Sequence, residues 1–149
     1  MTIVTQIFMG SVVLGICSMI HIVLLVAAIK LLRRMSPPDR ASRSPLHVLK
    51  LLIIGFSIVL FAHTLQVWIW AWSFIAMGTL PNISDAIYFS LVTYTTVGYG
   101  DVTVGGGFRV FGAMAAVTGL LNFGLSTAFL VGLFERMLPE QFPPPPPQP

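Results

Sequence analysis

Three long uncharged apolar stretches and one short one most strongly limit what this chain can fold into. Residues 3–29, 51–77 and 110–134 contain no charged side chain, and each exceeds the roughly 20 apolar residues that a membrane-spanning helix needs. Residues 83–97 are too short to cross and lie between Pro81-Asn82 and a glycine-rich segment. Charged residues make up only 9% of the chain, against about a quarter in soluble domains. The sequence predicts an all-α membrane protein with three transmembrane helices and a re-entrant segment.

Most of the basic residues lie between the first two spans, which predicts how the chain is oriented. Six of the eight are Lys30, Arg33, Arg34, Arg40, Arg43 and Lys50. Short basic loops beside apolar helices are typical of the cytoplasmic side of a membrane, and this explanation is favoured over a nucleic-acid partner. We therefore expect a multi-pass protein of the plasma membrane, with its N-terminus outside and its C-terminus in the cytoplasm.

The chain divides into four segments along its length. We expect an N-terminal transmembrane helix at 1–32, a basic cytoplasmic loop at 33–50, a pore domain at 51–138 and a proline-rich disordered tail at 139–149. No basic residue precedes the first apolar stretch, so a retained helix is favoured over a cleaved signal peptide. Five consecutive prolines in the tail favour an extended polyproline II strand, and a role as ligand for a proline-binding module stays open.

A glycine-containing motif follows the short apolar stretch: Thr95, Thr96, Val97, Gly98, Tyr99, Gly100 and Asp101. Rings of backbone carbonyls can replace the water shell of a potassium ion. Carbonyls that point at one axis require alternating backbone conformations, and glycine adopts positive φ at little cost. Gly98 and Gly100 stand at alternate positions, as this geometry requires. We expect the carbonyls of Thr96 to Tyr99 and the Thr96 hydroxyl to bind K⁺, while the Val97 and Tyr99 side chains point away.

One copy of this motif cannot make a ring, so four chains are needed. The segment before it, residues 84–95, is predicted to be a short helix with Ser84 as N-cap and Asp85 at the positive end of the helix dipole. Irregular backbone at membrane depth is tolerated only where it is buried in protein or lines a wet cavity. The motif is therefore predicted to line a pore.

On these residues the chain resembles the pore-loop potassium channel superfamily, of the type with two helices and a pore loop. The resemblance covers residues 51–135 and continues into the third span with Gly107-Phe108-Arg109, Gly119 and Phe123-Gly124. It implies a homotetramer, in which each chain assembles with three further copies of itself. The other expected partner is the lipid bilayer. The resemblance also implies an inverted cone of inner helices and passive, selective conduction of K⁺ ions. The span at 3–29 is additional, and no helix carries arginine at every third position, as a voltage sensor would.

The resemblance also orients the third span, with Leu120 toward the pore axis. At about 100° per residue, the same face carries Phe123 and Thr127 at the cavity, a narrow apolar ring at Val131 and a carboxylate ring at Glu135. Gly119 falls at the expected bend of the inner helix. A solvated helix end is the alternative for Glu135.

Polar and aromatic residues elsewhere in the spans predict helix contacts. Asn122 lies on the face opposite Leu120, at a depth similar to that of His63 in the second span, so a His63–Asn122 contact is expected. Trp68, Trp70 and Trp72 are expected to anchor the outer part of the second span near the interface.

Asp101 is expected to have an unusual environment, because family members often tether this aspartate with a glutamate and an indole. Here the corresponding positions are Val92 and Phe89, which offer no polar group. Tyr88, Tyr94, Thr93, Arg109 or water remain as partners. We therefore expect Asp101 to be less firmly held, and Asp101→Asn to change filter stability only modestly.

Three other functions compete with a conducting channel. A silent regulatory subunit would not need both glycines, and Tyr99 at its usual position argues against a non-selective cation channel. An enzyme is not supported, because the spans carry no Ser/His pair, His-Glu-x-x-His motif or paired carboxylates.

Overall fold

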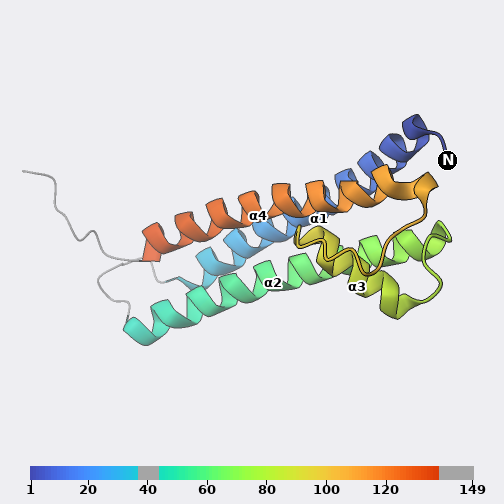
Figure 1. Ribbon diagram of the computed structural model, residues 1–149. Coiled ribbons are helices and arrows are strands. Elements are labelled where there is room, and N and C mark those ends of the chain that lie inside the picture. The colour runs from blue at the N-terminus through green and yellow to red at the C-terminus, as the bar shows by residue number, and fades with distance from the viewer. Residues whose placement is uncertain (37–43, 138–149) are drawn as a thin grey trace, which may run out of the picture.

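The computed structural model describes residues 1–36 and 44–137, which form three long helices side by side and one short helix (Figure 1). The long helices are α1 (Ile3–Met35), α2 (Pro45–Ala76) and α4 (Arg109–Met137); the short helix is α3 (Ile83–Tyr94). A 3₁₀ turn, Gly106–Phe108, leads into α4. Three helices are long and apolar enough to cross a membrane, and the described ranges contain no strand. The predicted all-α class with three membrane-spanning helices is confirmed.

The first two long helices extend further into the basic segment than predicted. Arg33 and Arg34 lie in the last turn of α1, where cations are favoured by the helix dipole. Pro45 occupies the first turn of α2, after an N-cap at Ser44, a position where proline costs nothing. The loop predicted over 33–50 is therefore shorter than expected; Arg40, Arg43 and the tail at 139–149 lie outside the described residues.

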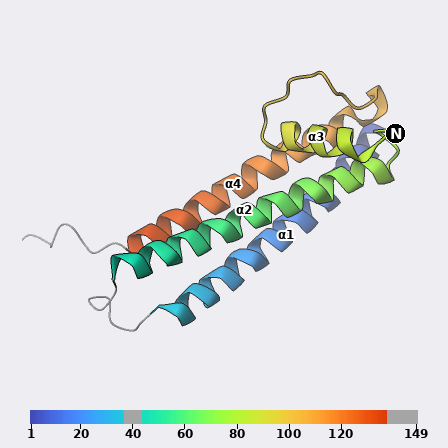
Figure 2. The same ribbon diagram turned by 90° about the horizontal axis from the view of Figure 1, so that it is seen from below.

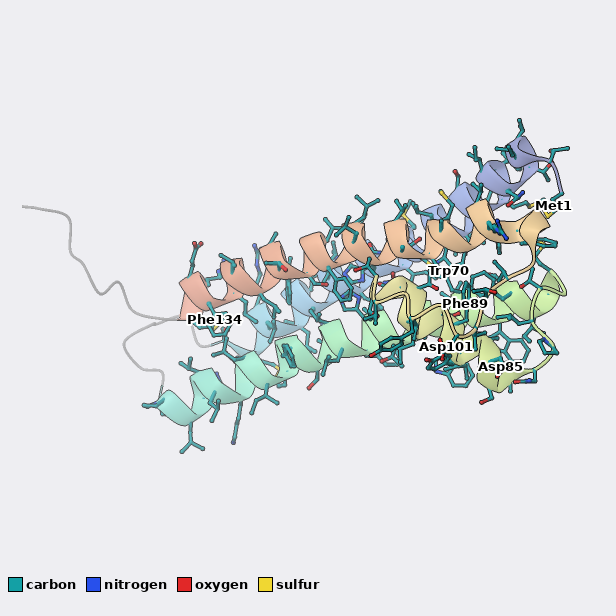
Figure 3. All side chains as sticks on the ribbon, in the orientation of Figure 1. Met1, Trp70, Asp85, Phe89, Asp101 and Phe134 are labelled. Atoms are coloured by element: carbon teal, nitrogen blue, oxygen red, sulfur yellow. The ribbon has the colours of Figure 1, made fainter. Side chains whose placement is uncertain are left out.

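The short helix α3 enters between α2 and α4, and the chain after it turns back, as a re-entrant segment does. Figure 2 shows α3, and the loop that connects it to α4, beside the end of the bundle where α1 begins. In Figure 3, Met1, Asp85 and Asp101 lie toward one end of the bundle and Phe134 lies toward the other. The N-terminus and the outer end of the predicted filter are thus on the same side.

The additional helix α1 packs along both α4 and α2 rather than standing apart. Its buried residues recur at helical spacing: Gln6, Gly10, Cys17, His21, Leu25, Ala28 and Leu32. The Gln6 side-chain oxygen accepts hydrogen bonds from the backbone N–H of Val110, at 3.0 Å, and of Phe111, at 3.4 Å. It thereby satisfies two of the N–H groups that a helix start leaves without an intrahelical partner. α1 therefore holds the beginning of α4.

An aromatic cluster joins α2, α3 and α4 behind the filter. Phe74 stands edge-on to Phe89 and to Phe111, with ring centroids 5.0 and 5.5 Å apart, the geometry that aromatic rings prefer. Trp70 belongs to this cluster and is fully buried, whereas Trp68 and Trp72 are exposed. The prediction that all three indoles anchor one interface was wrong for Trp70.

Candidate functional site

The short helix α3 begins with a different cap from the one predicted. Asn82, not Ser84, is the N-cap: its side-chain oxygen accepts from the Asp85 N–H at 2.8 Å, and its amide donates to the Asp85 carboxylate at 2.9 Å. Both residues are good partners for a helix start, because an amide oxygen satisfies a free N–H and a carboxylate complements the dipole. Asp85 lies in the first turn, as predicted.

The other end of α3 is held against the inner helix at Gly119. Tyr94, the last residue of α3, is buried. A Cβ added at Gly119 would overlap the Tyr94 carbonyl oxygen and lie 2.9 Å from its carbonyl carbon. Only glycine allows α4 to come this close to the backbone that leads into the filter motif.

The filter backbone alternates in the sense that the two glycines predicted. Within the filter motif, positive φ occurs at Thr96, Gly98 and Gly100, with φ of 62°, 58° and 81°. The residues between them do not share it. Alternation is confirmed, and it extends to Thr96, where the residue type gave no indication because positive φ is uncommon for a non-glycine residue.

The filter side chains have few neighbours within the chain. Tyr99 is 73% exposed and Val97 is 53% exposed. Large apolar side chains at such exposure are typical of surfaces that other chains cover. These two side chains are therefore left largely uncovered by the rest of the chain.

Asp101 is tethered to α3 by a hydrogen bond from Tyr88. The Tyr88 hydroxyl donates to the Asp101 carboxylate at 2.6 Å, the short distance of a charge-assisted hydrogen bond. This bond holds the pKa of Asp101 below its ordinary value and raises the pKa of Tyr88. Tyr88 is one of the candidate donors that the sequence left open. Its single hydrogen bond stands in place of the glutamate and indole that often hold this aspartate in the family that the chain resembles.

We expect Tyr88→Phe to accelerate the decay of current severalfold, because it removes this bond and keeps the ring. Asp101→Asn is the matched milder change, since its amide oxygen still accepts from Tyr88. The lowered pKa means that the bond contributes fully above the ordinary carboxyl pKa of about 4 and is lost only as the external pH falls below it. The difference in decay between wild type and Tyr88→Phe should therefore be the same at external pH values of about 7.5 and about 5. Equal decay in Tyr88→Phe and wild type would contradict the tether.

A closed ring of hydrogen bonds lies beneath the filter and joins all four helices. We call this the polar ring; its members are Gln66, His21, Ser126, His63 and Tyr94. In that order, successive side chains are 2.7, 2.9, 2.9 and 2.9 Å apart, and Tyr94 returns to Gln66 at 2.8 Å. Four of the five residues come from spans that are otherwise apolar, so each polar group is satisfied inside the protein, as lipid requires.

Asn122 joins the polar ring from one side, and its partner differs from the one expected. Its amide donates to the Gln66 side-chain oxygen, whereas His63 bonds to Tyr94 and Ser126. The expected direct His63–Asn122 contact is therefore replaced by one through Gln66 and Tyr94. The two residues lie at similar depth, but Gln66, one turn from His63, reaches the buried face of α4.

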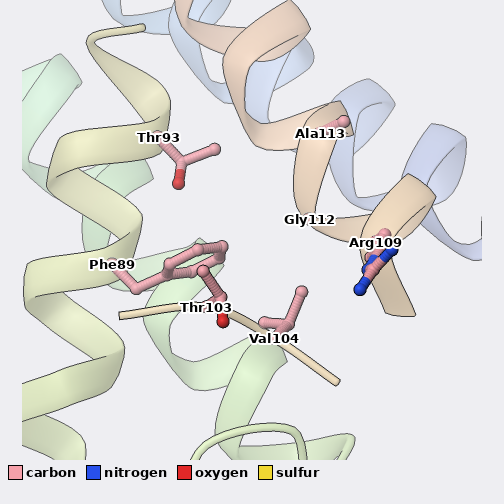
Figure 4. A pocket seen from close by; sticks show the side chains of 7 residues that line it. All are labelled: Phe89, Thr93, Thr103, Val104, Arg109, Gly112 and Ala113. Atoms are coloured by element: carbon pink, nitrogen blue, oxygen red, sulfur yellow. The ribbon is translucent and has the colours of Figure 1, made fainter. Parts of the chain in front are cut away.

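An open pocket lies on the other side of α3, near the start of α4 (Figure 4). Its lining residues are Phe89, Thr93, Thr103, Val104, Arg109, Gly112 and Ala113. Arg109 and Thr93, two sequence candidates for holding Asp101, therefore line this pocket, while the Asp101 carboxylate bonds to Tyr88.

The predicted cavity face of α4 is exposed within the single chain. Leu120 is 66% exposed, Val131 is 50% exposed and Phe123 is 38% exposed, and Thr127 and Glu135 are exposed as well. Gly119 is buried against Tyr94. Within the single chain Gly119 is therefore covered, whereas the other residues of the predicted cavity and gate are exposed.

Comparison with known proteins identifies the family. A family model described as "Ion channel" matches residues 48–136, more than half of the chain, and includes most of α2, all of α3, the filter motif and nearly all of α4. The chain belongs to this ion channel family. Membership of the pore-loop potassium channel superfamily, predicted from the filter motif, is confirmed, and the protein is a channel rather than an enzyme.

Curated relatives share a short region with this ion channel. It is 42% identical over 57 residues to the human potassium voltage-gated channel subfamily A member 6 and 39% identical over 57 residues to subfamily A member 2 of Xenopus laevis. The first alignment covers 36% of this chain and 10% of the relative; the second covers 36% and 11%. The chain therefore spans about a tenth of the length of these relatives. No solved structure matches.

Sequence reasoning missed most of the polar ring. It selected His63 and Asn122, but it placed Gln66, His21, Ser126 and Tyr94 in no common site with them. Polar residues in otherwise apolar spans were the available indication, because each needs a partner in lipid. Which partners meet depends on how α1 packs, and periodicity does not determine that.

Proposed function

We propose that four copies of this chain form a potassium-selective pore through which K⁺ crosses the membrane passively. The observation that carries this proposal is the alternating backbone at Thr96, Gly98 and Gly100. Alternation turns successive carbonyls toward one side, and four such strands would form the oxygen cages that replace the hydration shell of K⁺. The carbonyls of Thr96, Val97, Gly98 and Tyr99 would bind the ions.

Assembly as a homotetramer is supported by what a single chain leaves uncovered. The filter forms only one side of a pore, and Tyr99, Val97 and Leu91 are exposed beside it. Leu120 and Val131 are exposed along α4. In a fourfold assembly, neighbouring copies would cover the side chains beside the filter, and the exposed residues of α4 would face the shared cavity.

The experiment that tests selectivity uses purified protein in liposomes, with reversal potentials measured under opposed potassium and sodium gradients. We expect the reversal potential to follow the potassium gradient, and the conducting species in detergent to have the mass of four chains. A reversal potential midway between the two ions would indicate a non-selective channel. A well-assembled tetramer that carries no current would favour the silent regulatory subunit.

We further propose that the filter's outer end and the N-terminus face the outside in the plasma membrane, with the C-terminus in the cytoplasm. Asp101 and Met1 lie toward one end of the bundle, and Lys30, Arg33 and Arg34 lie near the opposite end of α1. Basic residues favour the cytoplasmic side. In this orientation Glu135 is at the inner mouth of the pore.

We expect Glu135→Gln to lower outward conductance, and to do so more at low salt than at high salt. Glu135 is exposed near the end of α4, where four carboxylates would concentrate cations. Salt screens such a field, with a Debye length of about 10 Å at 0.1 M and about 3 Å at 1 M. Single-channel conductance of both proteins at the two salt concentrations provides the check. Equal reductions at both concentrations would count against the electrostatic account, and unchanged conductance at both would leave Glu135 as a solvated helix end.

A further inference from the structure

With the side-chain amides of Gln66 and Asn122 oriented as the structure has them, the polar ring has one consistent arrangement of protons. The Gln66 oxygen accepts from Tyr94 and from Asn122, so its amide nitrogen donates to His21 Nδ1. His21 then carries its proton on Nε2 and donates to Ser126. The single Ser126 proton is left for His63 Nε2.

The second half of the circuit follows by the same reasoning. His63 accepts at Nε2 and therefore carries its proton on Nδ1, from which it donates to the Tyr94 hydroxyl oxygen. Tyr94 donates its own proton to Gln66, which closes the ring. Every member donates once and accepts at least once within the ring, and both imidazoles are neutral.

A further proton on either imidazole breaks the circuit. On His21 it would place an N–H opposite the Gln66 amide N–H₂; on His63 it would displace the Ser126 proton from its acceptor. The two imidazoles face each other, with ring centroids 5.1 Å apart. Among the described residues, the other titratable groups here are Tyr94 on α3, which bonds to His63, and Cys17 on α1, which acts on Tyr94; α4 contributes the uncharged side chains of Ser126 and Asn122. No carboxylate is hydrogen-bonded to either imidazole within the described residues.

The ring is placed to act on the filter. Tyr94 immediately precedes Thr95 and Thr96, and its carbonyl group packs on Gly119. Phe123 covers the ring on the side of the predicted cavity, with its centroid 4.5 Å from that of His63 and 5.6 Å from that of Tyr94. Because His21 comes from α1, the additional helix reaches the inner end of the filter through this ring.

We propose that the polar ring positions the inner end of the filter, that α1 is thereby a working part of the pore, and that the ring functions only while both imidazoles are neutral. This rests on the proposed potassium conduction. Imidazoles ordinarily titrate near pH 6.5, and the intact ring favours their neutral form. Acid therefore opens the ring, releases Tyr94 and lets the filter pass more readily into a non-conducting state.

The test compares wild type with Tyr94→Phe in liposomes, with the pH on both sides set to about 7.5 or about 5.5. We expect acid to accelerate current decay severalfold in wild type. Tyr94→Phe keeps the aromatic packing but removes two ring bonds, so it should decay rapidly at the higher pH and respond little to acid. The proposal would be overturned if current through Tyr94→Phe decayed at the wild-type rate, or if acid accelerated its decay as much as in wild type.

Two control variants separate the ring from other groups. His47→Gln removes the remaining histidine, which bonds to the Met35 carbonyl at 3.1 Å, and should leave the acid response unchanged. Thr118→Val removes a buried hydroxyl of α4 that bonds only within its own helix, and should behave as wild type. If Tyr94→Phe does not assemble, Ser126→Ala is the second ring variant, with the same two expected results.

A second measurement does not depend on conduction. The thermal midpoint of the detergent-solubilised tetramer should fall on acidification in wild type and change less in Tyr94→Phe, because stability from neutral imidazoles is lost as they protonate. If the wild-type protein conducts no K⁺, the proposed function is refuted. The acid shift of the thermal midpoint still tests whether the polar ring depends on neutral imidazoles. An equal acid shift in both proteins would refute the ring.

Discussion

Gly119→Ala is expected to destabilise the assembled channel and to abolish most of its current. The added methyl group would overlap the Tyr94 carbonyl oxygen, and the obstacle is backbone, which cannot swing aside as a side chain can. Overpacking of this kind typically costs about 1–3 kcal/mol per site, and it would recur in each of four chains. Because Tyr94 leads directly into Thr95 and Thr96, the displacement would reach the inner end of the filter.

The same substitution also distinguishes two roles for Gly119. If this glycine serves only as a bend in the inner helix, alanine should stabilise the helix, since glycine is about 1 kcal/mol less favourable than alanine in a helix interior. If it serves as the contact with Tyr94, alanine should lower the thermal midpoint. The two accounts therefore predict opposite signs. Gly124→Ala is the matched control, because it lies on the same helix with nothing within 4 Å of the added Cβ.

The sequence predicted the architecture well because the membrane imposes it. Uncharged stretches long enough to span had to become helices, and the short stretch that ends in the filter motif had to turn back. Helix ends were less predictable: Asn82 and Ser84 are both good caps, and the choice between them depends on where the chain leaves α2. Trp70 shows the same limit, since residues two apart on a helix point in different directions and cannot all face one interface.

Contacts between helices were the part that sequence could not supply. Asn122 and His63 were correctly placed at one depth, yet the partner of Asn122 is Gln66. The difference arises from rotation about the helix axes, which is set by close packing at positions such as Gly10 and Gly119. The position of α1 was also open, because an additional span can pack on any apolar face of a pore domain. Its contact with α4 through Gln6 and its contribution of His21 emerge only in three dimensions.

Gly98→Ala is expected to abolish selective potassium current. Gly98 has a φ of +58°, in the left-handed region that costs an L-residue roughly 1–2 kcal/mol. Nothing lies within 4 Å of an added Cβ within the chain, so the expected penalty is one of backbone conformation. In four chains it amounts to about 4–8 kcal/mol, a large share of the 5–15 kcal/mol that stabilises a typical domain.

The filter has little capacity to absorb this penalty, because Thr96 already holds a φ of 62° without the freedom of glycine. Relaxation of residue 98 to negative φ would turn one carbonyl in each chain away from the axis and leave a K⁺ cage incomplete. Gly105→Ala is the matched control: its φ is −56° and its added Cβ has nothing within 4 Å, so current should stay at the wild-type level. Reversal potentials and single-channel currents of the two variants, at equal tetramer yield, make the comparison. Selective current through Gly98→Ala would mean that the carbonyls of this segment do not form the ion pathway.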